Sequence, residues 1–335
     1  MYYQKSKRMI KFSLIIPIYQ VEEFLDKCLE SCISQDLAIE EYEIIIINDG
    51  SKDNSLQIAE RFRSLNQNIY IHSQKNKGLS EARNAGLLYA SGKYIWFIDS
   101  DDWVRENCLN ELFTICEDND LDILHFNATD NSKEKVSVRE ENQKFYNTII
   151  SGKEYIKRNK FITFPVCFNI FKKSFLDENK IHFKSGVFHE DNEFSPRVFY
   201  FANKVSFKKK SYYNVYHNPN SITRKVNSKK SFDLLIIIDA TYEFLKKNVL
   251  EEEIRYKFYN YMGLAFNAAV ENIISASNND RRLFALELID KKEIISKIKK
   301  STLLQYKAQI IMFEISILLY LNFYTLIKKK KLVKW

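Results

Sequence analysis

Short apolar runs alternate with segments of helical periodicity over the first hundred residues. The runs are rich in β-branched side chains and cover residues 12–16, 43–47, 69–72 and 94–98. Continuous apolar runs of this length are typical of strands buried on both faces of a sheet. Residues 21–33 instead repeat their apolar side chains every three or four positions, and residues 53–65 and 79–90 are also predicted to be helical. Four strand–helix repeats predict an α/β domain around a mostly parallel sheet.

The pattern beyond residue 100 is less regular. It predicts helices at residues 105–119 and 190–201, strands at 123–126, 164–171 and 205–215, and a polar loop at 127–143. From Lys229 the chain has no proline and only Gly263 as glycine, so it is predicted to be helical throughout. We therefore expect a boundary near Ser228. The expected parts are an α/β domain over residues 1–228, with halves at 10–127 and 128–228, and a helical region over 229–335.

Single residues mark the expected ends of two early elements. Pro17 is expected to end the first strand, and Asp53 to cap the helix that follows the second.

Polar residues follow the predicted strands where a parallel sheet binds its ligands, beyond the carboxyl ends. Tyr19, Asp49 and the run Asp99-Ser100-Asp101-Asp102 all fall there. Two carboxylates at one strand end form a hard-oxygen site that suits Mg²⁺ or Mn²⁺, which would keep waters and bind diphosphate oxygens. The alternative is that Asp102 only caps a helix.

The other polar groups of this first part each have a functional and a structural interpretation. Asp49 could accept a hydrogen bond from a nucleobase imide or belong to a plain turn, and Glu22 could be a first-turn helix residue. Lys77 and Arg83, at a predicted helix start, could pair with a diphosphate or with the aspartates. Their alternative is an ordinary beginning of a helix.

Two later segments carry further candidate chemistry. His189-Glu190-Asp191 precedes a predicted helix, and a carboxylate there could deprotonate an acceptor hydroxyl or cap the helix. Four polar residues around Pro219 are also candidates. His217 could be a metal or phosphate partner, Ser221 and Thr223 could donate hydrogen bonds to a diphosphate, and Arg224 could be a cationic partner. The alternative for this segment is a surface turn.

Composition narrows the class of protein. The chain has 335 residues, of which 45% are apolar, so a sizeable core is expected. Its formal net charge of +8 indicates either an anionic partner, such as phosphates or a membrane surface, or a solvated lysine-rich exterior. No common DNA- or RNA-binding motif is present, so a nucleic-acid partner is not expected.

The cysteines and the N-terminus indicate where the protein works. The five cysteines are odd in number and lack a Cys-x-x-Cys pair, which favours a reduced cytoplasm without disulfides or zinc. Cys28 and Cys32 lie one helical turn apart and are expected in the core. Residues 1–11 are polar and do not resemble a secretory signal. The expected location is cytoplasmic, peripheral on the inner face of the cell membrane.

Four sequence blocks together resemble the family-two inverting glycosyltransferases, which have a GT-A fold. The blocks lie at residues 13–19, 47–55, 76–86 and 95–102, and their order and spacing cover about a third of the chain. Residues 186–191 also resemble the Glu-Asp motif of the family, and residues 216–224 a loop over the diphosphate. One departure is Asn169, at a place where relatives often carry lysine.

The resemblance implies a role for each matching residue. It places Pro17, Tyr19 and Glu22 near the base, Asp49 on uracil and Asp99 near the ribose. It makes Asp101 the metal ligand, Asp191 the catalytic base and Glu190 its neighbour. The remaining donor-site residues that it implies are Ser100, Lys77, Arg83, Ser221, Thr223 and Arg224, with His217 beside the metal.

The implied activity is transfer of a hexose or N-acetylhexosamine from a UDP-sugar, with Mn²⁺ or Mg²⁺, during synthesis of O-antigen, capsule or exopolysaccharide. The acceptor would be a lipid-diphosphate-linked sugar or an oligosaccharide. A nucleotidyltransferase is an alternative, but it needs a glycine-rich loop where residues 16–19 have no glycine. A non-catalytic membrane-bound assembly subunit with a transferase fold is a second alternative.

Residues 310–327 are strongly apolar and precede four lysines at 328–331. Glu314, Asn322 and Thr325 fall near one helical face, so we expect an amphipathic helix on an anionic leaflet rather than a transmembrane span. The alternative is a core helix or the interface of a homo-oligomer.

Overall fold

The computed structural model describes residues 9–131, 135–137, 140–159, 162, 165–216, 227–317 and 320–321. They fall into two compact units. Unit 1 comprises Met1–Gly152, Phe164–Gly186 and Tyr200–Pro219, and unit 2 comprises Lys153–Thr163, Val187–Phe199 and Asn220–Trp335. The segment around Asp191 therefore groups with the C-terminal helices. The division expected near Ser228 stays a prediction.

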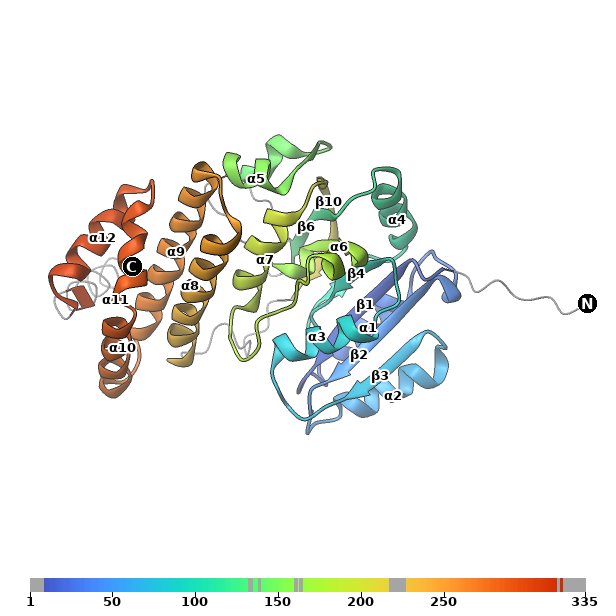
Figure 1. The fold of residues 1–335 in the computed structure, drawn as a ribbon. Helices are drawn as coiled ribbons and strands as arrows, with labels where there is room; N and C mark the ends of the chain where they lie inside the picture. The colour runs from blue at the N-terminus through green and yellow to red at the C-terminus, as the bar shows by residue number, and fades with distance from the viewer. Residues whose placement is uncertain are drawn as a thin grey trace, which may run out of the picture. The chain divides into compact units, whose positions relative to one another are not determined.

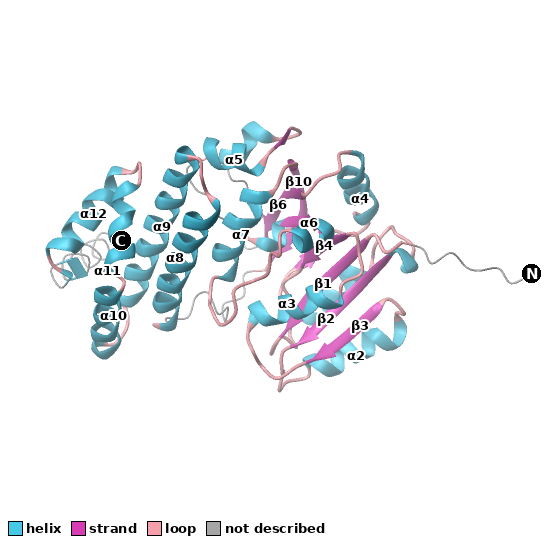
Figure 2. Ribbon diagram, in the orientation of Figure 1, coloured by secondary structure: helices cyan, strands magenta, loops and turns pink. Residues whose placement is uncertain are grey.

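Unit 1 is built on one mixed sheet, drawn in magenta in Figure 2. Its main path runs β3-β2-β1-β4-β9-β6-β10-β5. These strands are β1 (Phe12–Ile18), β2 (Tyr42–Asn48), β3 (Ile69–Ser73), β4 (Tyr94–Phe97), β5 (Trp103–Val104), β6 (Ile123–Asp130), β9 (Asn169–Lys172) and β10 (Val205–Val215). The strands β3, β2, β1 and β4 pair in parallel, and β6 and β10 run in the same direction because β9 pairs antiparallel with both β4 and β6. Strands β7 (Lys135–Ser137) and β8 (Ile149–Ile150) pair at the side with β6 and β10.

The helices of unit 1 connect these strands. They are α1 (Leu25–Ile33), α2 (Ser55–Leu65), α3 (Leu79–Tyr89), α4 (Leu109–Asp118) and α6 (Lys173–Glu178), with short 3₁₀ turns η1 (Ile39–Glu41), η2 (Glu140–Phe145) and η3 (Val166–Phe168). Helix α3 packs on β1 and β2 at very close range. A Cβ atom on Gly86 would lie only 2.2 Å from Cγ2 of Ile15, so a glycine is required there.

Alternation along the strands determines which side chains meet which layer. Phe12, Leu14 and Ile16 join one core cluster with Cys28 and Cys32 of α1, which confirms the prediction that these cysteines are core residues. All five cysteines of the chain are free and buried. Strands β1, β2 and β4 are thus buried on both faces, as expected, whereas β3 is buried only at Ile69 and exposes Tyr70.

Several element boundaries differ from the sequence predictions. Pro17 lies inside β1 rather than after it. The Ile15 carbonyl accepts a hydrogen bond from Ile98, and position 17 faces the same side, where β4 has already ended at Phe97. The missing N–H of Pro17 therefore breaks no ladder bond.

Two further predictions are corrected. The region 127–143 is not a loop throughout, because β6 continues to Asp130 and pairs with β7. Residues 105–119 begin their helix only at Leu109, after the unpredicted strand β5. Asp53 does contribute at the start of α2, since its Oδ1 atom accepts from the Ser55 amide at 3.2 Å.

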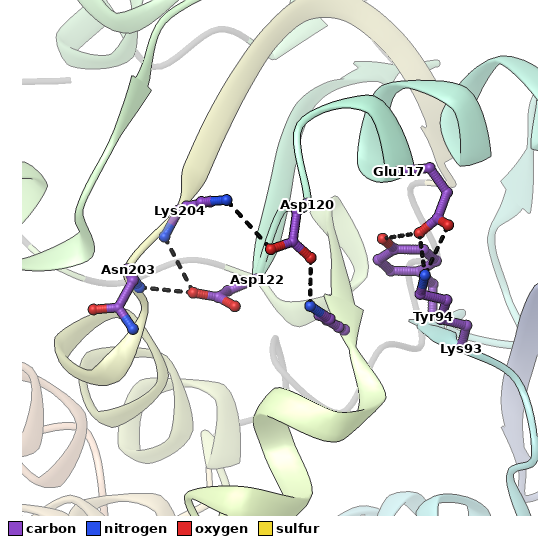
Figure 3. Close-up of polar contacts among 8 residues, drawn as sticks. Lys93, Tyr94, Glu117, Asp120, Asp122, Asn203 and Lys204 are labelled. Carbon is purple, nitrogen blue, oxygen red and sulfur yellow. Dashed lines mark hydrogen bonds and ion pairs between the residues drawn. The ribbon is translucent and has the colours of Figure 1, made fainter.

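A charged network lies where the parallel strands begin (Figure 3). Glu117 accepts hydrogen bonds from Lys93 and Tyr94 at 2.7 Å each, and Asp120 accepts from Lys172 and Lys204. Because these residues precede the parallel strands or end antiparallel β9, the network occupies the sheet edge opposite the candidate site. Each cation has a carboxylate partner, so we assign the network a structural role.

The described residues of unit 2 are mainly helical. Its helices are α5 (Gly152–Arg158), α7 (Glu190–Phe201), α8 (Lys229–Asn248), α9 (Glu252–Ile273), α10 (Asn278–Asp290), α11 (Lys292–Ser296), the 3₁₀ turn η4 (Lys297–Lys300) and α12 (Leu304–Ile315). Of these helices, only the first residue of α5 and the last two residues of α7 belong to unit 1. Helices α8 and α9 run side by side (Figure 1). The buried amide of Asn260 accepts from the Ser301 hydroxyl at 2.6 Å and from the Thr302 amide at 2.9 Å, which fixes the turn before α12.

The helix expected over residues 310–327 is interrupted among the described residues. Helix α12 ends at Ile315, Ser316 is extended with φ −162°, and residues 317, 320 and 321 are helical again. Residues 318–319 and 322–327, with Asn322 and Thr325, lie outside the described residues. Glu314 forms an ion pair with Lys299 at 2.7 Å, which accounts for this charge within an apolar segment. Among the residues that the structure describes, no helix is both long and apolar enough to span a bilayer.

Candidate active site

Asp49 directly follows β2 and holds the loop between β3 and α3 through hydrogen bonds. Its Oδ1 atom accepts from the Gln74 side chain at 2.8 Å and the Lys77 amide at 2.9 Å, and its Oδ2 atom accepts from the Gly78 amide at 2.8 Å. The side chain is buried. Gly78 takes φ +87°, a conformation that favours glycine, so the loop can turn its amides toward the carboxylate. This carboxylate organises the loop by itself, before any ligand contact.

The loop after β1 is held by a reciprocal pair of carboxylates. The Glu22 amide donates to Asp53 at 3.1 Å, while the Glu22 carboxylate accepts from the Asn54 amide at 2.8 Å. Glu22 therefore has a defined structural task at the start of α2. Tyr19 lies nearby at the end of β1 and is exposed, which leaves its ring accessible to a ligand.

Asp99 lies at the end of β4 and binds Arg83 of α3. The Arg83 guanidinium donates to Oδ1 of Asp99 at 2.6 Å, and the arginine is buried whereas the aspartate is one-third exposed. The ring of Phe183 lies 5.4 Å from the guanidinium carbon. The buried Arg83 thus holds Asp99 from the protein interior, and the exposed part of the Asp99 carboxylate is accessible to a ligand.

Asp102 is the buried member of the acidic run. Its carboxylate accepts from the Tyr216 amide at 2.7 Å and from the Tyr213 hydroxyl, whose oxygen accepts from the Asp99 amide at 3.0 Å. Burial, followed by the charges of Asp99 and Asp101, raises the pKa of Asp102 to about 8. The alternative role as a helix cap is wrong, because β5 and not a helix follows it.

Among the described residues, the acidic run needs further ligands to hold a metal. Asp101 is partly exposed and Ser100 is buried. Within the described ranges, no three His, Cys, Asp or Glu side chains are grouped closely enough to form a complete site. Mg²⁺ and Mn²⁺ are commonly held by one or two carboxylates plus substrate phosphates and water, so these residues fit such an ion. The negative charges that raise the pKa of Asp102 are those a cation would offset.

The second group of candidates lies in unit 2, at the start of α7. His189 has φ +61°, and its carbonyl accepts from the Asn192 amide at 3.0 Å. Glu190 is buried, and Asp191 is partly exposed. Burial lowers the pKa of His189. Of the two acids, Asp191 is therefore the one that can meet a substrate.

Other candidates are placed less centrally or not at all. The side chain of Lys77 is exposed, and Pro17 is buried within β1. Asn169 is fully buried, pairs with His125 at 2.9 Å and donates to the Pro165 carbonyl, so it is a structural residue. His217, Ser221, Thr223 and Arg224 lie outside the described residues.

Sequence reasoning missed Tyr213, which links Asp99 to Asp102. It belongs to β10, more than a hundred residues away along the chain. The only local signal was an aromatic residue in an alternating strand.

Replacing Asp49 by asparagine is expected to lower the free energy of unfolding by about 1–3 kcal/mol, because the new amide group would face backbone donors. Urea unfolding measures this. The control Glu22→Gln keeps an acceptor at a partly exposed position and should change stability by less than about 0.5 kcal/mol. Equal effects of the two substitutions would contradict the role given to Asp49.

Comparisons with known proteins now identify the family. Residues 13–179 match the sequence profile of Glycosyl transferase family 2. The chain is 31% identical over 260 residues to the uncharacterized glycosyltransferase EpsJ of Bacillus subtilis (strain 168), covering 76% of this chain and 71% of EpsJ.

Two solved structures share the fold. Residues 1–349 of S. aureus TarS, in complex with UDP, align with TM-score 0.66 and 21% identity, over 94% of this chain and 88% of that one. The mannosyltransferase PcManGT from Pyrobaculum calidifontis, in complex with GDP-Man and Mn²⁺, aligns with TM-score 0.56 and 11% identity, over 94% and 87%. These likenesses confirm the predicted GT-A fold with C-terminal helices. The chain belongs to glycosyl transferase family 2 and is an enzyme of the glycosyltransferase class.

Proposed function

We propose that this enzyme transfers a hexose or N-acetylhexosamine from a UDP-sugar to a sugar hydroxyl with inversion at the anomeric carbon. The observation that carries the proposal is the polar edge of the sheet, where Asp49 follows β2, and Asp99 and Asp101 follow β4, in a chain of this family. The UDP complex of TarS, which shares the fold, supports a uridine nucleotide. The proposed setting is synthesis of a bacterial surface polysaccharide.

Donor binding is assigned to unit 1. Tyr19 offers an exposed ring for the base, and Asp99 offers a carboxylate oxygen for the ribose hydroxyls. Asp49 is already engaged by the loop amides, so a uracil imide would add one more donor to a carboxylate that is held in place. Pro17, Glu22, Lys77, Arg83 and Ser100 complete the proposed donor site in unit 1, and Ser221, Thr223 and Arg224 complete it over the diphosphate.

Asp101 is the proposed metal ligand, with His217 as a second partner. A Mn²⁺ or Mg²⁺ ion bound there supplies positive charge that offsets the charge developing on the departing diphosphate. The Mn²⁺ complex of PcManGT supports this choice of ion.

Asp191 is the proposed general base, with Glu190 beside it. Its carboxylate takes the proton of the acceptor hydroxyl as the oxygen attacks the anomeric carbon. The bond from that carbon to UDP breaks on the opposite face, so the configuration inverts and UDP leaves. Glu190 is buried, so it would support the turn rather than meet the acceptor.

The test of the function is a donor screen with synthetic lipid-diphosphate-linked GlcNAc as acceptor. UDP release is measured from the UDP forms of glucose, galactose, GlcNAc and GalNAc, with Mn²⁺ or with EDTA. We expect one donor to give acceptor-dependent release that EDTA abolishes. Pyrophosphate release from a nucleoside triphosphate would instead indicate a nucleotidyltransferase, and UDP binding without turnover of any donor would indicate a non-catalytic subunit.

Asp191→Asn is expected to lower transfer at least about a hundredfold, because the amide cannot take the proton. The affinity for UDP, measured by calorimetry, should be unchanged. Asp118→Asn, at an exposed carboxylate at the end of α4, serves as the matched control and should retain full activity. Normal turnover by Asp191→Asn would refute the assignment.

The acceptor is proposed to be lipid-linked, with the enzyme peripheral on the inner membrane face. Helix α12 exposes Ile311 and Ile315, which supports a surface contact. Co-sedimentation with phosphatidylcholine–phosphatidylglycerol vesicles should fall in Ile311→Ser/Ile315→Ser and remain in the control Leu88→Ser, an exposed residue of α3. Binding that is unchanged in the double variant would contradict the contact, and a homo-oligomer interface over this helix would then be tested by sedimentation.

A further inference from the structure

Helix α7 contains a break in its own hydrogen bonding close to Asp191. Pro196 lies inside the helix and has no N–H group. In an α-helix, the amide of residue 196 would donate to the carbonyl of Asn192. That carbonyl, one residue beyond Asp191, therefore needs another donor.

Tyr261 of α9 supplies that donor. Its hydroxyl donates to the Asn192 carbonyl at 2.6 Å, and its side chain is buried. Burial, and then the charges of Asp191 and Glu193, raise the pKa of Tyr261, so the hydroxyl keeps its proton.

A second contact holds Phe188, which precedes the turn at the start of α7. Asp233 of α8, which is buried, accepts from the Phe188 amide at 2.8 Å and from the Lys229 ammonium group at 2.6 Å. His189 follows with φ +61°, a left-handed backbone conformation, between the Asp233 contact and the helix. The segment that enters α7 is thus held by α8, and the first turn of α7 by α9.

We propose that Tyr261 and Asp233 are positioning residues that hold Asp191 in place for proton transfer. The motifs that carry the family resemblance extend only to residue 224, before both residues, yet in this proposal both support the catalytic base. The inference rests on the proposed role of Asp191 as the base. It predicts that the C-terminal helices set the rate of the chemical step and leave donor binding unaffected.

The break in the helix provides a rescue experiment. Tyr261→Phe removes the donor and leaves the Asn192 carbonyl unpaired. Pro196→Ala restores an N–H at the position where the helix itself can bond that carbonyl. In Tyr261→Phe/Pro196→Ala, the amide of residue 196 should therefore replace the lost tyrosine hydroxyl as the donor to the Asn192 carbonyl.

The first measurement is hydrogen–deuterium exchange of peptides that span residues 188–195, which needs no substrate. We expect exchange to be roughly fivefold faster or more in Tyr261→Phe and to return toward wild type in the double variant. Exchange that is unchanged in Tyr261→Phe overturns the inference.

The second measurement is the rate of transfer with the donor and acceptor that the screen identifies. For Tyr261→Phe we expect kcat to fall about tenfold with the donor KM unchanged, and the double variant to recover most of it. A full kcat in Tyr261→Phe, or a loss that Pro196→Ala fails to recover, overturns the positioning role. If Asp191→Asn stays active, the proposed base is wrong, while the exchange result still tests the anchoring of α7.

Asp233 is tested in parallel with a matched acid on the same helix. Asp233→Ala should lower kcat and speed exchange over residues 188–191. Asp239→Asn removes one of the two acidic partners of Lys291, the other being Glu287, and should change neither kcat nor this exchange. An equal loss of activity in both variants would indicate a general loss of stability and would overturn the role of Asp233.

Discussion

A parallel sheet whose two faces are both covered leaves only its edges for polar side chains. In unit 1 this constraint separates two kinds of charge. The edge where the strands begin carries lysines and carboxylates that neutralise one another, as Figure 3 shows for Asp120 and Glu117. The edge where the strands end carries an excess of carboxylates. One of them, Asp99, pairs with the buried cation Arg83. A ligand that binds together with a cation therefore suits the edge where the strands end, because carboxylates are in excess there, and not the edge where the strands begin.

The carboxylates of the site do different work although they are chemically alike. Asp49 holds a loop through backbone amides, and Asp102 joins the end of β10 to the acidic run. Burial keeps the pKa of Asp102 high, at about 8, whereas Asp99 retains an exposed side. The buried acids therefore shape the site, whereas Asp99 and Asp101 are partly exposed.

Unit 2 shows how a helix with an internal proline can carry a defined side chain. Pro196 removes one bond of the helix ladder, and a tyrosine from a neighbouring helix replaces it. The replacement joins the turn that bears Asp191 to α9, so the C-terminal helices contribute to the geometry of that turn. A protein with an alanine at this position would not need the tyrosine contact.

The sequence by itself determined the alternation of strands and helices, the family, and the residues at the strand ends, because these depend on short-range periodicity and on motifs of fixed spacing. It misplaced the end of β1 and did not predict β5, where the outcome depends on a neighbouring strand, and it did not predict the break after α12. Only the tertiary structure decided what each acid does. The partners of Asp49, Asp102 and Asn192 lie 28, 114 and 69 residues away along the chain, and no local pattern encodes such pairs.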